Sequence, residues 1–160
     1  MKHITLMVLV GYCLLGQMPD ILAQNQVKKV KIEELKALIS TKDEQVKVLN
    51  FWATWCRPCI QELPYFEKAH QTFDEAEVKV YLIAIEDELE KVQAFIQKKG
   101  ITAEVWLLDE KDPNAWIPQI YDKWGGDIPV TIFLHQDEML FHQGIYPEEK
   151  LLAQIRSYLR

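Results

Sequence analysis

The chain has 160 residues, of which 49% are hydrophobic and 26% are charged, and this composition suits one globular domain with a buried core. Its formal net charge is −6 at pH 7, so the chain lacks the excess of basic residues by which proteins usually bind nucleic acids. We therefore expect no nucleic acid among its partners.

The first residues have the pattern of a secretory signal peptide. Lys2 and His3 precede the apolar run Ile4–Leu15, and the small residue Ala23 follows a short mixed segment. This run of about a dozen residues is shorter than the roughly 20 that a membrane-spanning helix needs. We therefore expect cleavage after Ala23 and export of the mature chain, to the periplasm or otherwise out of the cytoplasm.

This interpretation gives a signal peptide over residues 1–23 and one domain over residues 24–160, with no stable membrane span after cleavage. The alternative is an uncleaved membrane anchor, because Ile21 is not the small residue that usually stands two positions before a cleavage site. Cys13 lies inside the apolar run, and we expect it to leave with the signal peptide.

Strands and helices alternate along the rest of the chain. Apolar runs predict six strands, the first of them at a sheet edge and the last two in a hairpin: Val27–Ile32, Val46–Trp52, Val78–Ile85, Val105–Leu108, Val130–Leu134 and Met139–His142. Apolar residues at helical spacing predict five helices, over Glu33–Ser40, Cys56 to Phe73, Glu86–Lys99, Asp112 to Trp124, and Glu148–Leu159. This order indicates an α/β domain with a mixed sheet covered by helices on both faces.

The second predicted helix begins at two cysteines. Cys56 comes directly after a buried strand, in the first turn of the helix, where free backbone N–H groups and the helix dipole favour a negative charge. A thiolate is the reactive form of cysteine, and this position lowers the pKa of the thiol. Cys59 follows one helical turn later, so the two sulfurs are close enough to form a bond. Further along the same helix, Pro64 is expected to introduce a kink.

Cleavage of the signal peptide would leave Cys56 and Cys59 as the last two cysteines of an exported protein. A disulfide between them would close only a very small loop, so it would add little stability through loop-closure entropy. The pair therefore favours a redox role over a structural one.

Three features of the chain resemble the thioredoxin superfamily: the segment Phe-Trp-Ala-Thr-Trp-Cys-Arg-Pro-Cys at positions 51–59, the proline at Pro64, and Ile128-Pro129 before a hairpin strand. Within the superfamily the chain is most similar to the exported, membrane-associated or periplasmic TlpA/ResA-like thiol-disulfide oxidoreductases. The resemblance implies a thioredoxin fold, and the region Val78–Leu108 looks like the extra strand–helix insertion of that branch.

The resemblance also implies roles for particular residues. Cys56 matches the exposed attacking thiol of the family, and Cys59 matches the buried resolving thiol. Pro129 matches the cis-proline that faces the disulfide, and Ile128 matches the residue whose backbone pairs with a bound substrate chain. Trp55, beside the attacking cysteine, is expected on the protein-binding surface.

One position departs from thioredoxin itself, which has a buried aspartate six residues before its first cysteine. Here Asn50 stands at that place, and an amide cannot take up a proton. Glu62 instead matches a buried glutamate of the ResA-like branch, where burial would raise the pKa of the carboxyl and let it accept a proton from Cys59. The alternative is a glutamate on the solvent-facing side of the helix.

The function that the resemblance implies is an exported thiol-disulfide oxidoreductase that exchanges a Cys56–Cys59 dithiol or disulfide with protein substrates, as a reductase. Its expected partners are protein thiols and disulfides, with apocytochrome c as the family's suggestion, and a membrane or periplasmic electron donor. No cofactor and no metal are expected.

The alternative function is a copper- or zinc-binding module of thioredoxin fold that uses Cys56 and Cys59 as ligands. A structural zinc site would need two further ligands, and the chain has no second C-x-x-C motif. His135 and His142 flank the predicted hairpin turn, where surface histidines are common. A peroxidase would need a Thr-x-x-Cys arrangement, and Ala53 occupies the threonine position.

Overall fold

The computed structural model describes residues 26–160, so the predicted signal peptide and Cys13 lie outside the described residues. The strands are β1 (Lys28–Val30), β2 (Val46–Trp52), β3 (Val78–Ala84), β4 (Glu104–Leu108), β5 (Val130–His135) and β6 (Glu138–Gln143). The helices are α1 (Ile32–Ser40), α2 (Arg57–Thr72), α3 (Leu89–Lys99), α4 (Pro113–Ile120) and α5 (Glu148–Tyr158). Element order and type agree with the prediction.

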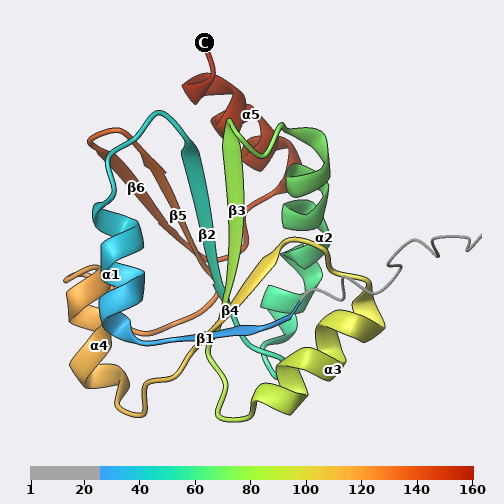
Figure 1. The fold of residues 1–160 in the computed structure, drawn as a ribbon, viewed down its shortest axis with the longest axis vertical. Coiled ribbons are helices and arrows are strands. Elements are labelled where there is room, and N and C mark those ends of the chain that lie inside the picture. The colour runs from blue at the N-terminus through green and yellow to red at the C-terminus, as the bar shows by residue number, and fades with distance from the viewer. Residues whose placement is uncertain (1–25) are drawn as a thin grey trace, which may run out of the picture.

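The strands form one mixed sheet in the order β1-β4-β3-β2-β5-β6 (Figure 1). The first four of these are mutually parallel, whereas β5 runs antiparallel to β2 and β6 antiparallel to β5. The predicted edge position of β1 is confirmed, and the segment Val78–Leu108 forms the parallel β3–α3–β4 unit. All seven residues of β2 are buried, because this central strand has a neighbouring strand on each side and helices over both faces.

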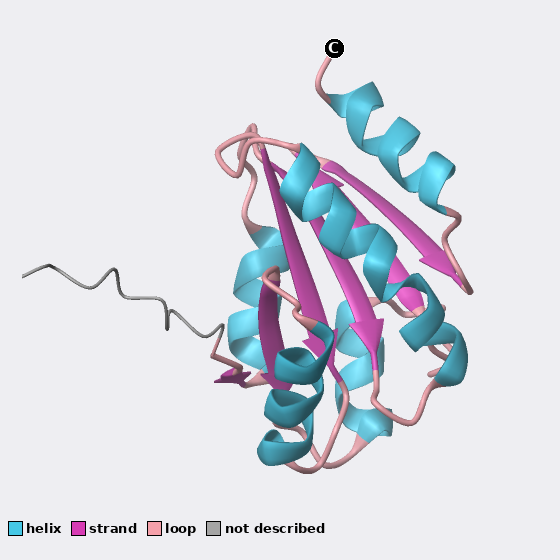
Figure 2. Cartoon of the chain, turned by 90° about the vertical axis from the view of Figure 1, so that its right-hand side faces the viewer, coloured by secondary structure: helices cyan, strands magenta, loops and turns pink. Residues whose placement is uncertain are grey.

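Two apolar cores lie on opposite faces of the sheet. Helices α2, α3 and α5 cover one face (Figure 2). Phe66, Ile96 and Leu151 are fully or almost fully buried in the core beneath them. Helices α1 and α4 cover the other, where Leu35 and Trp116 pack in the second core. The α/β architecture with helices on both faces is therefore confirmed.

Two predicted helix boundaries were wrong, each because a side chain has a tertiary partner. Helix α3 begins at Leu89, three residues after the predicted start at Glu86, and the Glu86 carboxylate instead accepts the backbone N–H of Thr54 at 2.9 Å. Helix α4 ends at Ile120, because the next residue is extended and the chain then turns to place Trp124 in the core. Helix α2 continues through Pro64 as one element.

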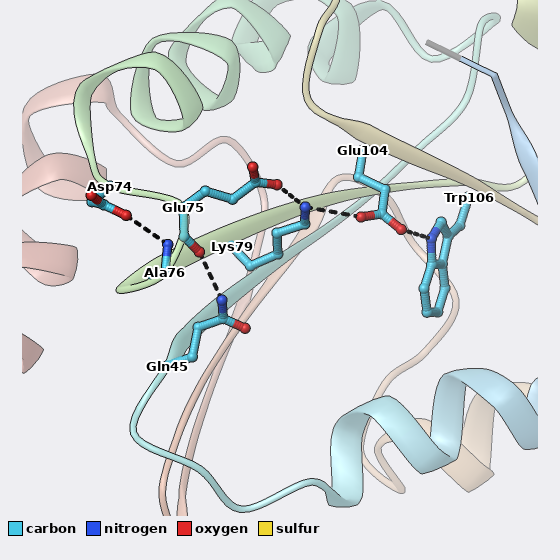
Figure 3. Close-up of polar contacts among 7 residues, drawn as sticks. All are labelled: Gln45, Asp74, Glu75, Ala76, Lys79, Glu104 and Trp106. Carbon is cyan, nitrogen blue, oxygen red and sulfur yellow. Dashed lines mark hydrogen bonds and ion pairs between the residues drawn. The ribbon is translucent and has the colours of Figure 1, made fainter.

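Polar contacts cluster at the end of the sheet where the parallel strands begin (Figure 3). Lys79 forms ion pairs with Glu75 and with Glu104, whose carboxylate also accepts the indole N–H of Trp106 at 2.6 Å. Gln45, just before β2, donates to the backbone carbonyl of Glu75 at 2.8 Å. These contacts tie together the starts of β2, β3 and β4. Among residues 26–160, the structure has no helix long and apolar enough to cross a membrane.

Candidate active site

The opposite end of the sheet carries the cysteines, in the tight turn between β2 and α2. Residues 53–55 leave the buried strand, and Thr54 is held there because its N–H and hydroxyl both donate to the Glu86 carboxylate. The backbone N–H of Cys56 donates to the carbonyl of Ala53 at 3.1 Å, which closes the turn. The chain then enters α2 with Pro58 in the first turn, where a proline fits without loss of a hydrogen bond.

Cys56 and Cys59 are joined by a disulfide, with their Cα atoms 5.3 Å apart. Cys56 is the N-cap residue of α2, and its sulfur accepts the backbone N–H of Cys59 at 3.3 Å. Cys59 is fully buried, whereas Cys56 retains 5% of its exposure. The helix N-terminus therefore directs a backbone donor at the sulfur that is nearer to solvent, and this arrangement stabilises a thiolate at Cys56.

The loop before β5 lies against the same sulfur. The Ile128–Pro129 peptide bond is cis, and the Ile128 carbonyl oxygen lies 3.8 Å from Cys56 Sγ. The Pro129 carbonyl accepts the N–H of Gly144 at 2.8 Å, so the segment that follows β6 holds this loop in place. Two segments far apart in sequence are thus brought together at the disulfide by the pairing of β5 with β2.

Glu62 is fully buried one helical turn after Cys59, so the alternative of a solvent-facing glutamate is wrong. Its Oε1 accepts from Asn50 Nδ2 at 2.7 Å, and its Oε2 accepts from the backbone N–H of Tyr146 at 2.7 Å. Burial raises the pKa of the carboxyl from 4.5 to about 7, and the two hydrogen bonds lower it by less. A carboxyl that titrates near neutral pH can take up and release a proton at this place.

The site contains groups that were not predicted. Asn50 was expected to be a mere substitution for an aspartate, but its amide binds Glu62 directly. The Tyr146 contact comes from a backbone N–H, which leaves no signature in side-chain identity. Ile145 lies between Gly144 and Tyr146, whose backbone N–H groups bind Pro129 and Glu62, and it is 43% exposed.

Trp55 is the most exposed large apolar residue of the described part of the chain, with 69% of its surface accessible. Its ring borders a small pocket of about 150 Å³ that is also lined by Trp116, Glu86 and Asp87. Together with the partly exposed Ile128, Trp55 gives the surface around Cys56 an apolar character.

The two histidines of the hairpin pack separately against tyrosine rings. The His135 ring centre lies 5.2 Å from that of Tyr158, and the His142 ring centre lies 4.6 Å from that of Tyr146. Across residues 26–160, no three histidine, cysteine or acidic side chains gather in a way that could hold a metal ion.

The fold and the buried disulfide at the start of α2 define a thioredoxin-fold protein. The sequence matches the model of the AhpC/TSA family over residues 15–142, and the chain belongs to this family.

Similar proteins agree with the predicted resemblance. The chain is 29% identical over 111 residues to the thiol-disulfide oxidoreductase ResA of Oceanobacillus iheyensis, which covers 68% of the chain and 55% of that protein. It is 38% identical over 84 residues to the thioredoxin-like protein YneN of Bacillus subtilis, which covers 51% of the chain and 48% of that protein. The chain thus spans about half the length of the curated relatives it matches.

Solved structures share the fold at lower sequence identity. A thioredoxin-related protein from Neisseria meningitidis serogroup B superposes with a TM-score of 0.64 at 22% identity, over 75% of this chain and 88% of that one. StoA from Bacillus subtilis superposes with a TM-score of 0.57 at 24% identity, over 76% of this chain and 87% of that one. The predicted similarity to ResA-like thioredoxin-fold proteins is confirmed.

Proposed function

We propose that the protein is an exported thiol-disulfide oxidoreductase that reduces disulfides of other proteins. The observation that carries the proposal is the disulfide at the start of α2, whose less buried sulfur lies 3.8 Å from the Ile128 carbonyl of the loop before β5. A bonded cysteine pair at a helix N-terminus, next to an open surface, suits reversible exchange better than structural support. The name of the ResA relatives supports the same chemistry.

In the proposed reaction the Cys56 thiolate attacks one sulfur of a substrate disulfide. A bond forms between Cys56 and that sulfur, and the other substrate sulfur leaves as a thiolate. Cys59 then gives its proton to the ionised Glu62 carboxylate and attacks Cys56 as a thiolate. The Cys56–Cys59 disulfide forms and the second substrate sulfur leaves, so the substrate gains two electrons and the protein loses two.

The substrate would lie on the apolar surface formed by Trp55 and Ile128, with the buried Pro129 beneath it in the same loop. An extended substrate segment could pair with the backbone of Ile128 in the manner of an added strand, which gives affinity without demanding one side-chain sequence. Apocytochrome c is one candidate substrate. A membrane or periplasmic electron donor would return the disulfide to the dithiol state after each turnover.

The reducing direction rests on the buried Glu62, because its carboxylate, one turn after Cys59, disfavours a thiolate there, and a less stable thiolate makes the disulfide less oxidising. The exposed Arg57, next to Cys56, acts in the opposite sense because a positive charge stabilises the thiolate and makes the disulfide more oxidising. Equilibration with glutathione redox buffers measures the balance. A reduction potential below that of glutathione supports a reductase, and a clearly higher one indicates an oxidant.

The exchange itself is tested with the reduced protein and a model protein disulfide such as insulin. The wild type is expected to reduce the substrate, and Cys56→Ala is expected to be inactive because it lacks the attacking sulfur. The metal content of the reduced protein is measured in parallel. Stoichiometric zinc or copper that disappears in Cys56→Ala, together with absent exchange, would favour the metal-binding alternative.

Trp55→Ala is expected to separate binding from chemistry. Because the side chain is 69% exposed, its loss should leave the thermal unfolding transition nearly unchanged. Reduction of a protein substrate should slow by about tenfold, as for loss of an aromatic residue at an interface, whereas exchange with glutathione should keep its rate. Lys98→Ala, on the exposed face of α3, is the control. Equal slowing with both substrates would contradict a binding role for Trp55.

A further inference from the structure

The amide of Asn50 is bonded on one side only. Asn50 lies in the middle of β2 and is fully buried. Its Nδ2 donates to Glu62 Oε1 at 2.7 Å and lies 3.5 Å from the Val130 carbonyl oxygen, but its Oδ1 is buried and accepts no hydrogen bond from residues 26–160. A buried amide oxygen without a donor costs free energy, and the opposite orientation of the amide would place Oδ1 where Nδ2 now lies.

Thr131 offers the donor that Oδ1 lacks. Its Oγ1 lies 3.4 Å from Asn50 Nδ2, where it acts as an acceptor, and the residue is fully buried. Within the described part of the chain this is the hydrogen bond that the Thr131 hydroxyl makes, so its O–H hydrogen has no acceptor there. A hydroxyl can donate as well as accept, and a turned Asn50 would present an acceptor to it.

The observed orientation suits one protonation state of Glu62. Both groups that face the carboxyl are donors, namely Asn50 Nδ2 and the Tyr146 N–H, and two donors fit an ionised carboxylate. A protonated carboxyl carries an O–H, which needs an acceptor. Rotation of the Asn50 amide by a half turn exchanges Nδ2 and Oδ1. Oδ1 then accepts from both Glu62 and Thr131, and the contact between Nδ2 and the Val130 carbonyl oxygen is lost.

We infer that Asn50 is a positioning residue whose amide turns when Glu62 gains or loses its proton, with the Thr131 hydroxyl completing the turned arrangement. The inference rests on the proposed role of Glu62 as the acceptor of the Cys59 proton. In that step the proton moves from the Cys59 sulfur to a Glu62 oxygen, and no covalent bond of Asn50 or Thr131 changes. The turn costs the NH2 group its contacts with the Glu62 carboxylate and the Val130 carbonyl oxygen, so the turned amide is favoured only while Glu62 is protonated.

The pKa of the Glu62 carboxyl depends on its burial and on its hydrogen bonds. Burial raises the pKa of the carboxyl, and the hydrogen bonds from Asn50 and Tyr146 lower it, without a contribution from a charged side chain. The titratable groups nearby are Cys59 on α2, which is bound in the disulfide, and the phenol of Tyr146, with His142 packed against that ring. In the oxidised protein Glu62 therefore titrates free of thiol ionisation.

The test is the titration of the Glu62 carboxyl carbon by NMR in the oxidised protein, with Glu62→Gln to identify its signal. Thr131→Val removes a hydroxyl that would donate to Asn50 in the protonated arrangement, whereas in the ionised arrangement it only accepts a long hydrogen bond of 3.4 Å from Asn50 Nδ2. It should therefore lower the midpoint by about half a pH unit, or roughly threefold in the ionisation constant. Thr131→Ser restores the hydroxyl and should restore the midpoint, and Thr41→Val, an exposed helix-end substitution, is the control. An unchanged or raised midpoint in Thr131→Val would overturn the turning of the amide.

Asn50→Leu tests the positioning role itself. The ionised carboxylate loses a charge-assisted hydrogen bond, which is stronger than the neutral one lost by the acid, so the midpoint should rise by at least about half a unit. A midpoint equal to that of the wild type would remove Asn50 from the site. Because these titrations need no substrate, they can fail while the insulin assay of the proposed exchange succeeds, and the reverse.

Discussion

Cys59→Ser is expected to turn a protein that exchanges disulfides into one that stays bound to its substrate. Cys56 can still attack, but the mixed disulfide lacks the buried sulfur that would resolve it. Without that intramolecular step, release depends on uncatalysed rearrangement, which takes on the order of minutes to hours. The adducts are measured after acid quenching and alkylation, by non-reducing electrophoresis and mass spectrometry.

The matched control for this trap is Cys56→Ser, which keeps Cys59 but lacks the attacking sulfur. It should form no adduct, because Cys59 is fully buried and out of reach of a protein substrate. Adducts that form equally in both variants would contradict the assignment of Cys56 as the nucleophile. Absence of thiol-sensitive adducts in Cys59→Ser would contradict exchange with proteins.

Glu62→Gln is expected to stabilise the oxidised protein at alkaline pH and to have little effect in acid. Burial holds the pKa of Glu62 at about 7, whereas an unfolded glutamate titrates near 4.5. Between these values the folded state binds more protons than the unfolded state, so the stability due to Glu62 is lost as pH rises through 7. A neutral amide avoids this loss, and we expect a gain of about 2–3 kcal/mol in the free energy of unfolding at pH 9.

The measurement is urea unfolding of wild type and Glu62→Gln at pH 4 and pH 9, both in the oxidised state. Glu33→Gln removes an exposed carboxylate from α1 and corrects for the change in net charge. A gain at pH 9 that vanishes at pH 4 supports the raised pKa. An equal effect at both pH values would mean that Glu62 titrates like an ordinary surface carboxyl.

The arrangement around Cys56 could be predicted because it depends on neighbours in sequence. A buried strand, a sharp turn and a helix start place a sulfur at free N–H groups, whatever the rest of the chain does. Burial of Glu62 was expected from the resemblance to the ResA-like branch and not from the helical pattern, which left a solvent-facing glutamate open. The placement of Cys56 is local, and the order of strand, turn and helix is enough to find it.

The other half of the site depends on tertiary contacts that leave no pattern in the sequence. The Tyr146 N–H reaches Glu62 from 84 residues away, and any residue except proline would supply the same donor. Likewise, Glu86 fits the helical pattern of α3, but it lies outside the helix, where its carboxylate accepts the backbone N–H of Thr54, 32 residues earlier. Asn50 was identified as a position but not as a partner, because the sequence does not say which way a buried amide faces.

The ion pairs of Lys79 with Glu75 and Glu104 lie where the parallel strands begin, whereas the disulfide lies where β2 ends. The ion pairs that join the strands and the reactive disulfide therefore lie at opposite ends of one sheet. Substitutions, a label or a solid support can be placed at the end with the ion pairs without a change to either sulfur or to the surface beside the disulfide. Conversely, substitutions around the disulfide can change its reactivity while the ion-paired end of the sheet stays the same.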